Sequence, residues 1–515
     1  MTYRRTLFAL MSVLLAWTGA ARAATPCADL ATLSMPNAKV TAAQVVEAGR
    51  FTPPAPARGG GAAAQPYAAL GAFCRVSLTL TPSADSDITV EVWLPASGWN
   101  GKYQAVGAGG MAGSIPYQLL APALAAGYAA SGTDTGHVGN NADFMPAHPE
   151  KLTDFAHRAI HEMSIASKRV VDAHYGKAPA FSYYNGCSGG GRAGLANAQR
   201  HPADFDGIIA GAASWNPMRM DAARVAVNRF VNRTPASAIP ASKYRMVHDA
   251  VMASCDGLDG VKDGVLENPT ACTFDYASLA CTAGDAPACL TAPQVESARA
   301  LTSSLRHPVT GAVLFEGHLW PGAELEWDTL GGAQPLSNAL IRLKNITYQD
   351  PSWDPSRFDP AVDVDYAEKR DAGVMAFNDM DLRPFFKEGG KLLMYHGWAD
   401  PQVTPQNSIN YFQGVLKTVG ASASSSIALF MLPGVSHCDG GSGPDTFDGP
   451  AAMSQWVEPG QKPTRIIASR VRDGKVDRTR PLCAFGHVAR YTGKGDTNDA
   501  ANFTCVVQAI NTRRR

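Results

Sequence analysis

A short strand, a glycine-rich turn around a serine and a helix of small residues follow one another between residues 181 and 199. The strand covers 181–184, the turn contains Gly186-x-Ser188-x-Gly190, and the helix covers 191–199. Glycines on both sides of the serine let a strand turn sharply into a helix, which presents the Oγ atom above the sheet. The helix N-terminus also favours developing negative charge. We therefore predict that Ser188 is a nucleophile; the alternative is a glycine-rich turn with an incidental serine.

Strands and helices alternate on both sides of this turn, which is typical of a mostly parallel sheet covered by helices. Strands are predicted at 75–81, 88–94, 103–106, 127–131, 207–210, 391–396 and 427–432, and helices at 154–174 and 405–419. The alternation is lost between 216 and 385, a segment rich in Asp, Gly and Pro with four cysteines. We predict an α/β catalytic domain formed by 24–215 and 386–515, with an inserted lid domain at 216–385. Residues 51–65, rich in Pro, Gly and Ala, are predicted to form a mobile loop.

Two polar residues later in the chain follow predicted strands. Asp400 comes just after strand 391–396, and His437 just after strand 427–432. Ligands bind at this end of the strands in open α/β sheets, and the order Ser, Asp, His is that of the α/β-hydrolase fold. We predict that His437 is the base for Ser188 and that Asp400 orients it. Asp439 is the other candidate acid, but its position two residues from His437 makes it a poor orienting group.

An oxyanion hole needs two N–H donors beside the nucleophile. The Gly189 N–H, directly after the nucleophile, is the first expected donor. The second is expected from the glycine-rich turn after strand 103–106, at Gly109 or Gly110. Losing one such donor typically costs ~3 kcal/mol of transition-state stabilisation.

The first 23 residues have the pattern of a secretory signal peptide. Arg4 and Arg5 are followed by a short apolar run over 7–17 and an Ala21-Arg22-Ala23 cleavage site. That run is shorter than the ~20 residues that span a bilayer, and no later stretch is long and apolar enough. We expect a secreted or periplasmic protein. Without Arg4, Arg5 and Arg22 the chain has 42 basic and 45 acidic residues, a net charge of −3. This balance predicts no nucleic-acid or membrane partner.

Ten cysteines follow the signal segment, and an even count in an exported chain implies disulfides. There is no CxxC pair, which argues against a zinc or iron–sulfur site. Cys187 precedes Ser188 and Cys438 follows His437. If the serine and histidine are in hydrogen-bond reach, the two cysteines are close as well, and a disulfide requires Cα atoms roughly 4.4–6.8 Å apart. We predict a Cys187–Cys438 bond that joins nucleophile to base; a purely structural bond would leave both adjacencies unexplained.

The chain resembles the tannase and feruloyl esterase family, including fungal-type feruloyl esterase B and the hydrolase of mono(hydroxyethyl) terephthalate. The motifs that carry the resemblance are FCRV (73–76), EVWLP (91–95), WNGKY (99–103), GCSGGGR (186–192), HPADFDGIIAGA (201–212), DLRPFF (381–386), YHGWADPQVTP (395–405) and GVSHC (434–438). The resemblance implies an α/β-hydrolase core with a lid, the Ser188–Asp400–His437 triad, and hydrolysis of a small aromatic acid ester of feruloyl or galloyl type. It implies no organic cofactor.

Other functions remain open at this point. Hydrolysis of mono(hydroxyethyl) terephthalate uses the same scaffold and is the first alternative. A peptidase or thioesterase is another, although export argues against a coenzyme A thioester. A non-catalytic binding protein is the third, which the intact Ser, Asp, His and glycine set disfavours.

The resemblance also implies a structural calcium ion in the lid. Its ligands would be carboxylates and backbone carbonyls within one short segment: Asp256, Asp259, Val261, Asp263 and Val265. The segment is not an EF-hand, because Leu258 and Gly260 occupy positions three and five counted from Asp256. A solvated acidic turn is the alternative. The remaining disulfides implied by the resemblance are Cys27–Cys74, Cys255–Cys272, Cys281–Cys289 and Cys483–Cys505.

Two further groups of residues could contribute to a site. His157 and His161 have the i, i+4 spacing of a metal-binding pair on a helix, but no third ligand is evident, so a packed or hydrogen-bonded helix face is expected. Trp320, Trp327 and Trp353 could stack on an aromatic acyl group or belong to the lid core.

Overall fold

The computed structural model describes residues 24–54, 67–111 and 113–508. The predicted signal peptide, residues 1–23, lies outside the described residues, and so does most of the predicted loop at 51–65. No helix in the described part of the chain is both long and apolar enough to span a bilayer.

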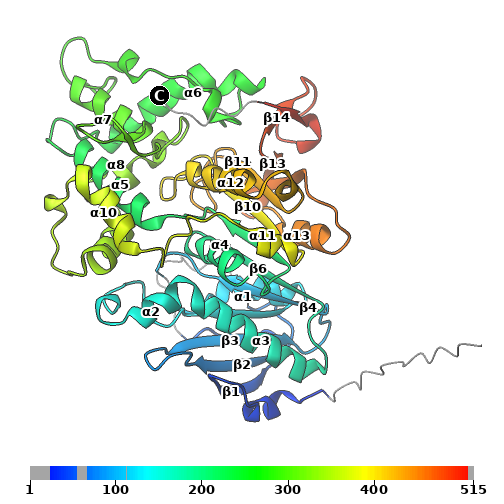
Figure 1. Ribbon diagram of the computed structural model, residues 1–515. Helices are drawn as coiled ribbons and strands as arrows, with labels where there is room; N and C mark the ends of the chain where they lie inside the picture. The colour runs from blue at the N-terminus through cyan, green and yellow to red at the C-terminus, as the bar shows by residue number, and fades with distance from the viewer. Residues whose placement is uncertain (1–23, 55–66, 112, 509–515) are drawn as a thin grey trace, which may run out of the picture.

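A nine-stranded sheet forms the centre of the molecule (Figure 1). The strand order is β1-β2-β3-β5-β4-β6-β7-β10-β11; the first four strands pair antiparallel, and the pairs from β5–β4 to β10–β11 are parallel. The strands span Ala38–Val46, Phe73–Leu80, Ile88–Pro95, Lys102–Gly107 (β4), Ala129–Thr133 (β5), Phe181–Cys187, Gly207–Gly211, Lys391–Gly397 (β10) and Ile427–Leu432. This mostly parallel sheet has the topology of an α/β-hydrolase-like core.

The burial of each strand follows from its place in the sheet. Every residue of β7 and β11 is buried, as expected for parallel strands covered on both faces. β2, near the antiparallel edge, alternates between buried and half-buried residues over its second half. Helices cover the two faces, and Figure 1 shows α3 running across the strands. These helices are α1 (Tyr117–Ala125), α2 (Pro149–Thr153), α3 (Ala159–Tyr175), α4 (Gly189–Arg200), α12 (Pro405–Val419) and α13 (Gly449–Val457).

The predicted helix at 154–174 is continuous in space but changes type along its length. A π-helical turn, Asp154–Arg158, leads into α3. α3 ends at Gly176, whose φ of 70° places it in the left-handed region that terminates many helices. Its buried side includes Ala159, Met163 and Val170, as the sequence periodicity indicates.

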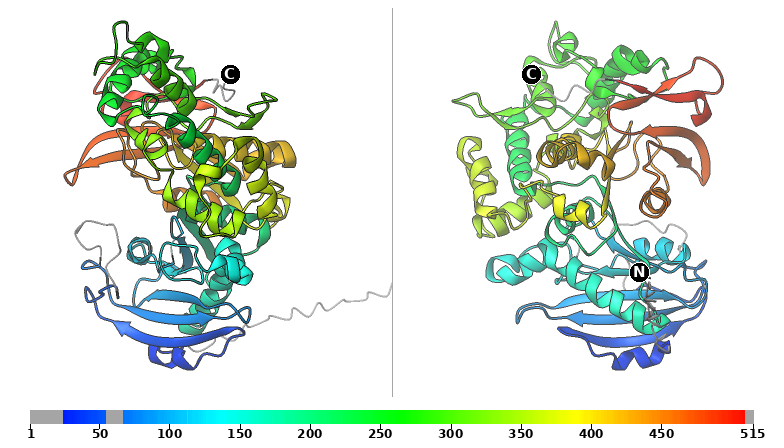
Figure 2. Two further views of the ribbon diagram at one scale, coloured as in Figure 1. Left: turned by 90° about the vertical axis from the view of Figure 1, so that its left-hand side faces the viewer. Right: turned by 45° about the vertical axis from the view of Figure 1, so that its right-hand side comes forward.

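The segment between β7 and β10 contributes no described strand to the nine-stranded sheet. It contains α5 (Pro217–Val231), α6 (Tyr244–Cys255), α7 (Ala292–Thr302), α8 (Asp328–Gly331), α9 (Ser337–Arg342), α10 (Pro360–Asp371), α11 (Arg383–Lys387) and the β8–β9 hairpin (Leu305–Arg306 and Val313–Phe315). Figures 1 and 2 show most of this segment, in green and yellow-green, gathered away from β1–β3. One apolar cluster, which includes Val247, Leu301 and Trp327, lies wholly within this segment, and a second is shared with residues between 111 and 156.

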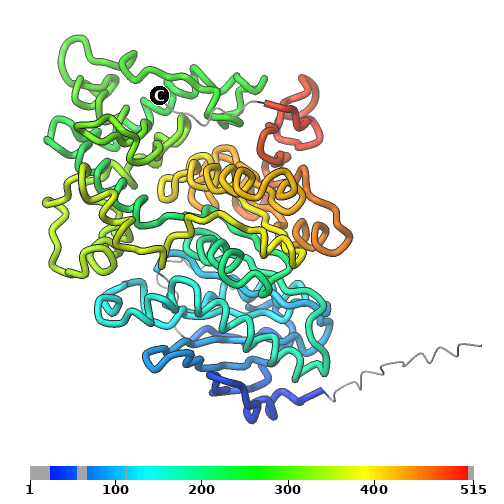
Figure 3. Tube along the Cα trace, in the orientation of Figure 1, coloured from blue at the N-terminus to red at the C-terminus, as the bar shows by residue number. Residues whose placement is uncertain are grey.

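Two antiparallel hairpins follow the sheet at the C-terminal end of the chain. They pair β12 (Arg465–Arg472) with β13 (Lys475–Cys483), and β14 (His487–Tyr491) with β15 (Phe503–Val507). In Figure 3 the second hairpin, β14–β15, drawn in red, lies beside the green part of the segment between β7 and β10. The contact is polar: the Ala489 N–H donates to Glu267 Oε1 over 2.8 Å, and Arg480 forms an ion pair with Asp263.

Candidate active site

Ser188 lies between β6 and α4 in a backbone conformation that few residues adopt. Its φ of 59° and ψ of −120° fall outside the helical and extended regions. The Ser188 N–H donates to the Gly211 carbonyl over 2.9 Å, and its carbonyl accepts from the Arg192 N–H over 2.8 Å. These bonds to β7 and α4 hold the strained turn that presents the Oγ atom.

His437 hydrogen-bonds to both other members of the predicted triad. Its Nε2 atom lies 2.7 Å from Ser188 Oγ, and its Nδ1 atom lies 2.7 Å from Asp400 Oδ2. Because an ionised carboxylate can only accept, Nδ1 carries the proton and Nε2 accepts from the serine hydroxyl. The three side chains that the sequence pattern selected therefore form one hydrogen-bonded chain.

The Asp400 carboxylate is fully buried and accepts four hydrogen bonds. Oδ1 accepts from the N–H groups of Gln402 and Val403, and Oδ2 accepts from His437 and from His396 Nε2, which lies 3.1 Å away. Burial acts to raise the pKa of Asp400, but the charges and hydrogen bonds of His437 and His396 outweigh it and hold this pKa well below its usual range. The carboxylate is therefore ionised at neutral pH.

His396, predicted only as part of strand 391–396, also contacts Asp400. Its Nδ1 atom lies 2.7 Å from Ser408 Oγ, and its Nε2 atom faces two acceptors, Asp400 Oδ2 and the Val403 carbonyl. Nε2 therefore carries the proton, and Nδ1 accepts from the serine. This buried imidazole donates to Asp400 Oδ2, the same oxygen that accepts from His437. Its position at the end of β10, four residues before Asp400, was the only available signal.

A disulfide joins the turn at Ser188 to the loop at His437. Cys187 and Cys438 are bonded, with Cα atoms 6.0 Å apart and 251 positions between them. Cys438 has a φ of 69°, so the chain turns sharply directly after His437. The covalent link and the Ser188–His437 hydrogen bond together fix the separation of the two segments. The structure also contains the four bonds Cys27–Cys74, Cys255–Cys272, Cys281–Cys289 and Cys483–Cys505.

The two predicted glycine segments meet beside Ser188. A Cβ atom built on Gly189 would lie 2.7 Å from the Gly110 carbonyl oxygen and 3.0 Å from its nitrogen, so no larger residue fits there. Gly110 has a φ of 65°, which favours glycine. Gly109 approaches from the other side, where a Cβ would lie 3.7 Å from Ser188 Cβ. Of the two candidates, Gly110 is the one whose backbone contacts Gly189, so it stays the expected second donor.

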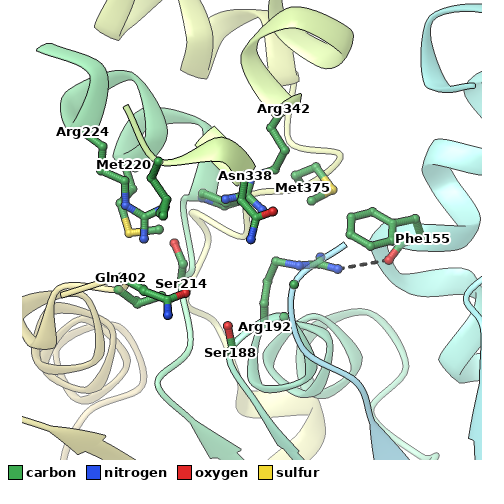
Figure 4. Close-up of a pocket in the computed structure, with 15 residues that line it drawn as sticks. Phe155, Ser188, Arg192, Ser214, Met220, Arg224, Asn338, Arg342, Met375 and Gln402 are labelled. Carbon is green, nitrogen blue, oxygen red and sulfur yellow. Dashed lines mark hydrogen bonds between the residues drawn. The ribbon is translucent and has the colours of Figure 1, made fainter. Parts of the chain in front are cut away.

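Two cavities open at Ser188. The larger, about 910 Å³, is lined by residues of the sheet and its loops, including Gly109, Gly110, His437 and Phe447. The smaller lies toward the 216–385 segment and is lined by both polar and apolar side chains (Figure 4). Its labelled residues are Phe155, Ser188, Arg192, Ser214, Met220, Arg224, Asn338, Arg342, Met375 and Gln402.

Three arginines distinguish this smaller cavity. Asp221 pairs with two of them, at 2.6 Å from Arg224 Nη1 and 3.0 Å from Arg342 Nη2. Arg192 donates instead to the backbone carbonyls of Phe155 and Ala156, and burial lowers its pKa to about 10. The residues that line this cavity therefore include three arginines and no carboxylate, although Asp371 and Asp400 also act electrostatically on Arg192 and Arg224. No local sequence pattern connects these arginines, which come from α4, α5 and α9.

The three tryptophans proposed for stacking do not line either cavity. Trp327 packs between Tyr244 and Tyr276 in the core of the inserted segment. Trp353 stacks on Tyr348, and Trp320 packs edge-on against Trp398. These side chains are core residues in this structure.

The acidic segment implied to hold calcium follows α6 and is closed by the Cys255–Cys272 disulfide. Asp256 Oδ1 is buried with no hydrogen-bond partner, which suits a bound cation. Burial and the charges of Asp263 and Asp256 raise the pKa of Asp259 to about 6. Asp263 contacts Arg480. These half-buried carboxylates repel one another and are ligands that a hard cation prefers, with Arg480 offsetting part of their charge; their oxygens do not all lie within 4.8 Å of one another in this structure.

Relatives of known sequence cover most of this chain. An uncharacterized esterase of Xanthomonas campestris pv. campestris is 34% identical, with 94% of this chain and 92% of the relative aligned. A probable feruloyl esterase B-1 of Aspergillus oryzae is 32% identical, with 86% of this chain and 85% of the relative aligned.

Solved structures agree with these sequence relatives. The crystal structure of feruloyl esterase B from Aspergillus oryzae has a TM-score of 0.85 and 29% identity, covering 93% of this chain and 99% of that one. The tannin acyl hydrolase from Aspergillus niger shares the fold, with a TM-score of 0.76, 22% identity and 92% coverage of each chain. The family model "Tannase and feruloyl esterase" matches residues 74–506, which include every element of the site described above. The chain therefore belongs to the tannase and feruloyl esterase family.

Proposed function

We propose that this protein is a serine carboxylic ester hydrolase that cleaves esters of aromatic acids, of feruloyl or galloyl type, through an acyl-enzyme on Ser188. The observation that carries the proposal is the chain of two 2.7 Å hydrogen bonds from Ser188 through His437 to Asp400. Family membership supports the substrate class. The five disulfides support function in an oxidising compartment, outside the cytosol.

In the proposed mechanism, Ser188 Oγ attacks the ester carbonyl as its proton passes to His437 Nε2. Asp400 stabilises the imidazolium that forms. The N–H groups of Gly189 and Gly110 stabilise the tetrahedral oxyanion. His437 then donates the proton to the leaving alcohol, and an acyl-serine remains. Water, deprotonated by His437, hydrolyses this ester and regenerates Ser188.

The reaction class can be tested with a substrate panel. Aromatic-acid methyl esters, p-nitrophenyl esters and peptides would be compared by kcat/KM. We expect methyl ferulate or methyl gallate to be hydrolysed, and peptides to remain intact. Peptide cleavage without ester cleavage would contradict the proposal.

The inserted segment at 216–385 is proposed as the lid, because α5 and α9 supply residues that face the cavity at Ser188.

Hydrolysis of mono(hydroxyethyl) terephthalate is a second candidate, favoured by the three arginines that line the smaller cavity. A half-ester of this kind carries a free carboxylate on its acyl group. Arg192, Arg224 and Arg342 line the cavity, and Asp221 offsets only part of their charge. Arginine is well suited to bind a carboxylate through paired donors.

This candidate predicts a charge preference. We expect kcat/KM for mono(hydroxyethyl) terephthalate to exceed that for the neutral bis(hydroxyethyl) ester at least about tenfold, the equivalent of about 1.4 kcal/mol. The variant Arg342→Gln should reduce this ratio, because it removes one cavity cation while Arg224 keeps its pairing with Asp221. Equal kcat/KM values for the two terephthalate esters, together with a higher value for methyl ferulate, would contradict this candidate and favour feruloyl esters as the substrates.

We also propose that the segment from Asp256 to Val265 holds a structural calcium ion. The carboxylates of Asp256, Asp259 and Asp263 and the carbonyls of Val261 and Val265 would be its ligands. The ion would supply positive charge that relieves the mutual repulsion of these carboxylates. Its role would be to brace the segment after α6, some way from the reacting atoms.

Calcium removal should therefore lower thermal stability. A ligand present at about 100 times its Kd stabilises by about 2.7 kcal/mol, so in a chain of this length chelation should lower Tm by roughly 2–3 °C. The variant Asp256→Asn should show little further loss of Tm on chelation. Asp249→Asn, an exposed position on α6 paired with Arg245, serves as the control and should respond as the wild type does. An unchanged wild-type Tm after chelation would contradict calcium binding.

A further inference from the structure

Three histidines and one aspartate form a group near the C-terminal end of α4, the helix that begins directly after Ser188. His157 and His161 come from the π-turn and α3, His201 directly follows α4, and Asp204 lies in the turn before β7. One nitrogen each from His161 and His201 and a carboxylate oxygen of Asp204 lie within 4.8 Å of one another. Among the described residues no other set of three His, Cys, Asp or Glu side chains meets this criterion.

We propose that His161, His201 and Asp204, with His157 as a fourth ligand, form a binding site for a divalent transition-metal ion such as zinc. The sequence supplied only the i, i+4 pair His157 and His161. The fold adds an imidazole and a carboxylate from a second element, which is the ligand set that zinc and its neighbours prefer.

The distances between the side chains are compatible with one ion. Ligands at about 2.1 Å from a tetrahedral ion lie roughly 3.4 Å apart. His161 Nδ1 lies 2.8 Å from Asp204 Oδ2, and His201 Nε2 lies 3.4 Å from His157 Nδ1. The rings of His161 and His201 stack at 3.8 Å with an angle of 13°. Coordination of one ion by both imidazoles would require these rings to rotate out of the stack so that their nitrogens converge.

Metal binding here would replace the His161–Asp204 hydrogen bond. That bond uses the Nδ1 proton of the imidazole and one carboxylate oxygen. When Nδ1 coordinates, the proton moves to Nε2, and Asp204 contributes its negative charge to the ion. His161 is 27% exposed and Asp204 10% exposed, so an ion can enter from the surface while the ligands stay partly shielded from water.

Nearby cations do not occupy this group. Lys168 donates to the backbone carbonyl of Asp204 and leaves its carboxylate to His161. Arg200 donates to the carbonyls of Gly373 and Val374. Arg158 is neutralised by Asp154 and Glu150. The ligand atoms therefore remain available to a metal ion.

The ion would join α3 to the turn between α4 and β7, two elements that flank the nucleophile's helix. No step of ester hydrolysis passes through it, so its expected effect is on stability. The inference is independent of the proposed esterase function, because it concerns residues that neither cavity at Ser188 includes.

The test is calorimetric titration of zinc into the full mature chain, purified without a histidine tag. Calcium in the buffer would keep the acidic segment at 256–265 occupied. We expect one zinc per chain with a Kd in the micromolar range or tighter, and a rise in Tm. His201→Ala should weaken binding at least about tenfold. His174→Ala, on the same helix but bonded to the Thr25 carbonyl, should bind zinc as the wild type does.

Two measurements guard against a folding artefact. Each variant's Tm without zinc reports whether it is folded; if His201→Ala is not, His161→Gln replaces it, since glutamine can still hydrogen-bond to Asp204. Crystals soaked in zinc should give an anomalous peak at the zinc edge between His161, His201 and Asp204. Absence of stoichiometric zinc binding by the wild type, equal affinity in folded ligand variants, or a peak elsewhere would overturn the proposal.

Discussion

Replacing Ser188 with alanine is expected to lower kcat by at least about 10⁴-fold while the protein remains folded. The hydroxyl is the group that would form the acyl bond, and no water molecule in its place can form that intermediate. The unusual backbone at Ser188, with φ of 59°, is fixed by hydrogen bonds of its own N–H and carbonyl to Gly211 and Arg192. Alanine retains both bonds, so we expect a Tm within a few degrees of the wild-type value.

A fluorophosphonate probe separates loss of the nucleophile from loss of substrate binding. Wild-type protein should be labelled at Ser188, and Ser188→Ala should not be labelled. Ser214→Ala is the matched control, because Ser214 lines the same cavity but is directed to Asn407. It should still react with the probe. Labelling or substantial turnover by Ser188→Ala would assign the nucleophile elsewhere.

The parts of the site that sequence alone could predict share a simple physical basis. Ser188, Asp400 and His437 lie one, three and five residues after the ends of β6, β10 and β11, strands whose largely apolar sequences could be recognised. The carboxyl ends of parallel strands meet at one edge of the sheet. Local sequence patterns were therefore enough to predict that these three residues lie close together. The adjacency of Cys187 and Cys438 added a constraint between segments 251 positions apart.

Other features had no local signal. β1 buries only Val40, so its sequence shows no alternation, and it forms by pairing with β2. The hairpin β12–β13 is rich in charged residues, β14 and β15 are only five residues long, and none of the four was predicted as a strand. The cavity arginines and the grouping of His161 with His201 depend on contacts between distant segments, which only the folded chain reveals.

The role of His396 shows how far a local pattern can mislead. It lies within a strand, in a position that usually packs in the core, and it is fully buried. Its N–H is nevertheless directed at the triad acid. Asp400 is therefore held by two imidazoles and two backbone N–H groups, and this arrangement determines what a substitution there should do.

Asp400→Asn is expected to lower kcat by about 10⁴-fold, the scale seen when a triad acid becomes an amide. The carboxylate accepts from four donors: the N–H groups of Gln402 and Val403, His396 Nε2 and His437 Nδ1. Asparagine has one oxygen, which can accept either from the two backbone N–H groups or from the two histidines. Its NH₂ group then faces the other pair of N–H donors and cannot accept from them. If the NH₂ group faces His437, the imidazole must present an unprotonated Nδ1 and carry its proton on Nε2. In that tautomer His437 cannot accept the Ser188 proton.

The control for this prediction is Asp439→Asn, which removes the other carboxylate near the base. Asp439 lies two residues after His437, whereas the hydrogen bond to His437 Nδ1 comes from Asp400. We expect Asp439→Asn to keep kcat within a few-fold of the wild-type value. Both variants would be compared at a saturating concentration of methyl ferulate or of the best substrate of the panel. A large loss in Asp439→Asn with little loss in Asp400→Asn would reverse the assignment. The reason for expecting the opposite is geometric: only Asp400 is buried beside the imidazole, with its charge held ionised by two histidines.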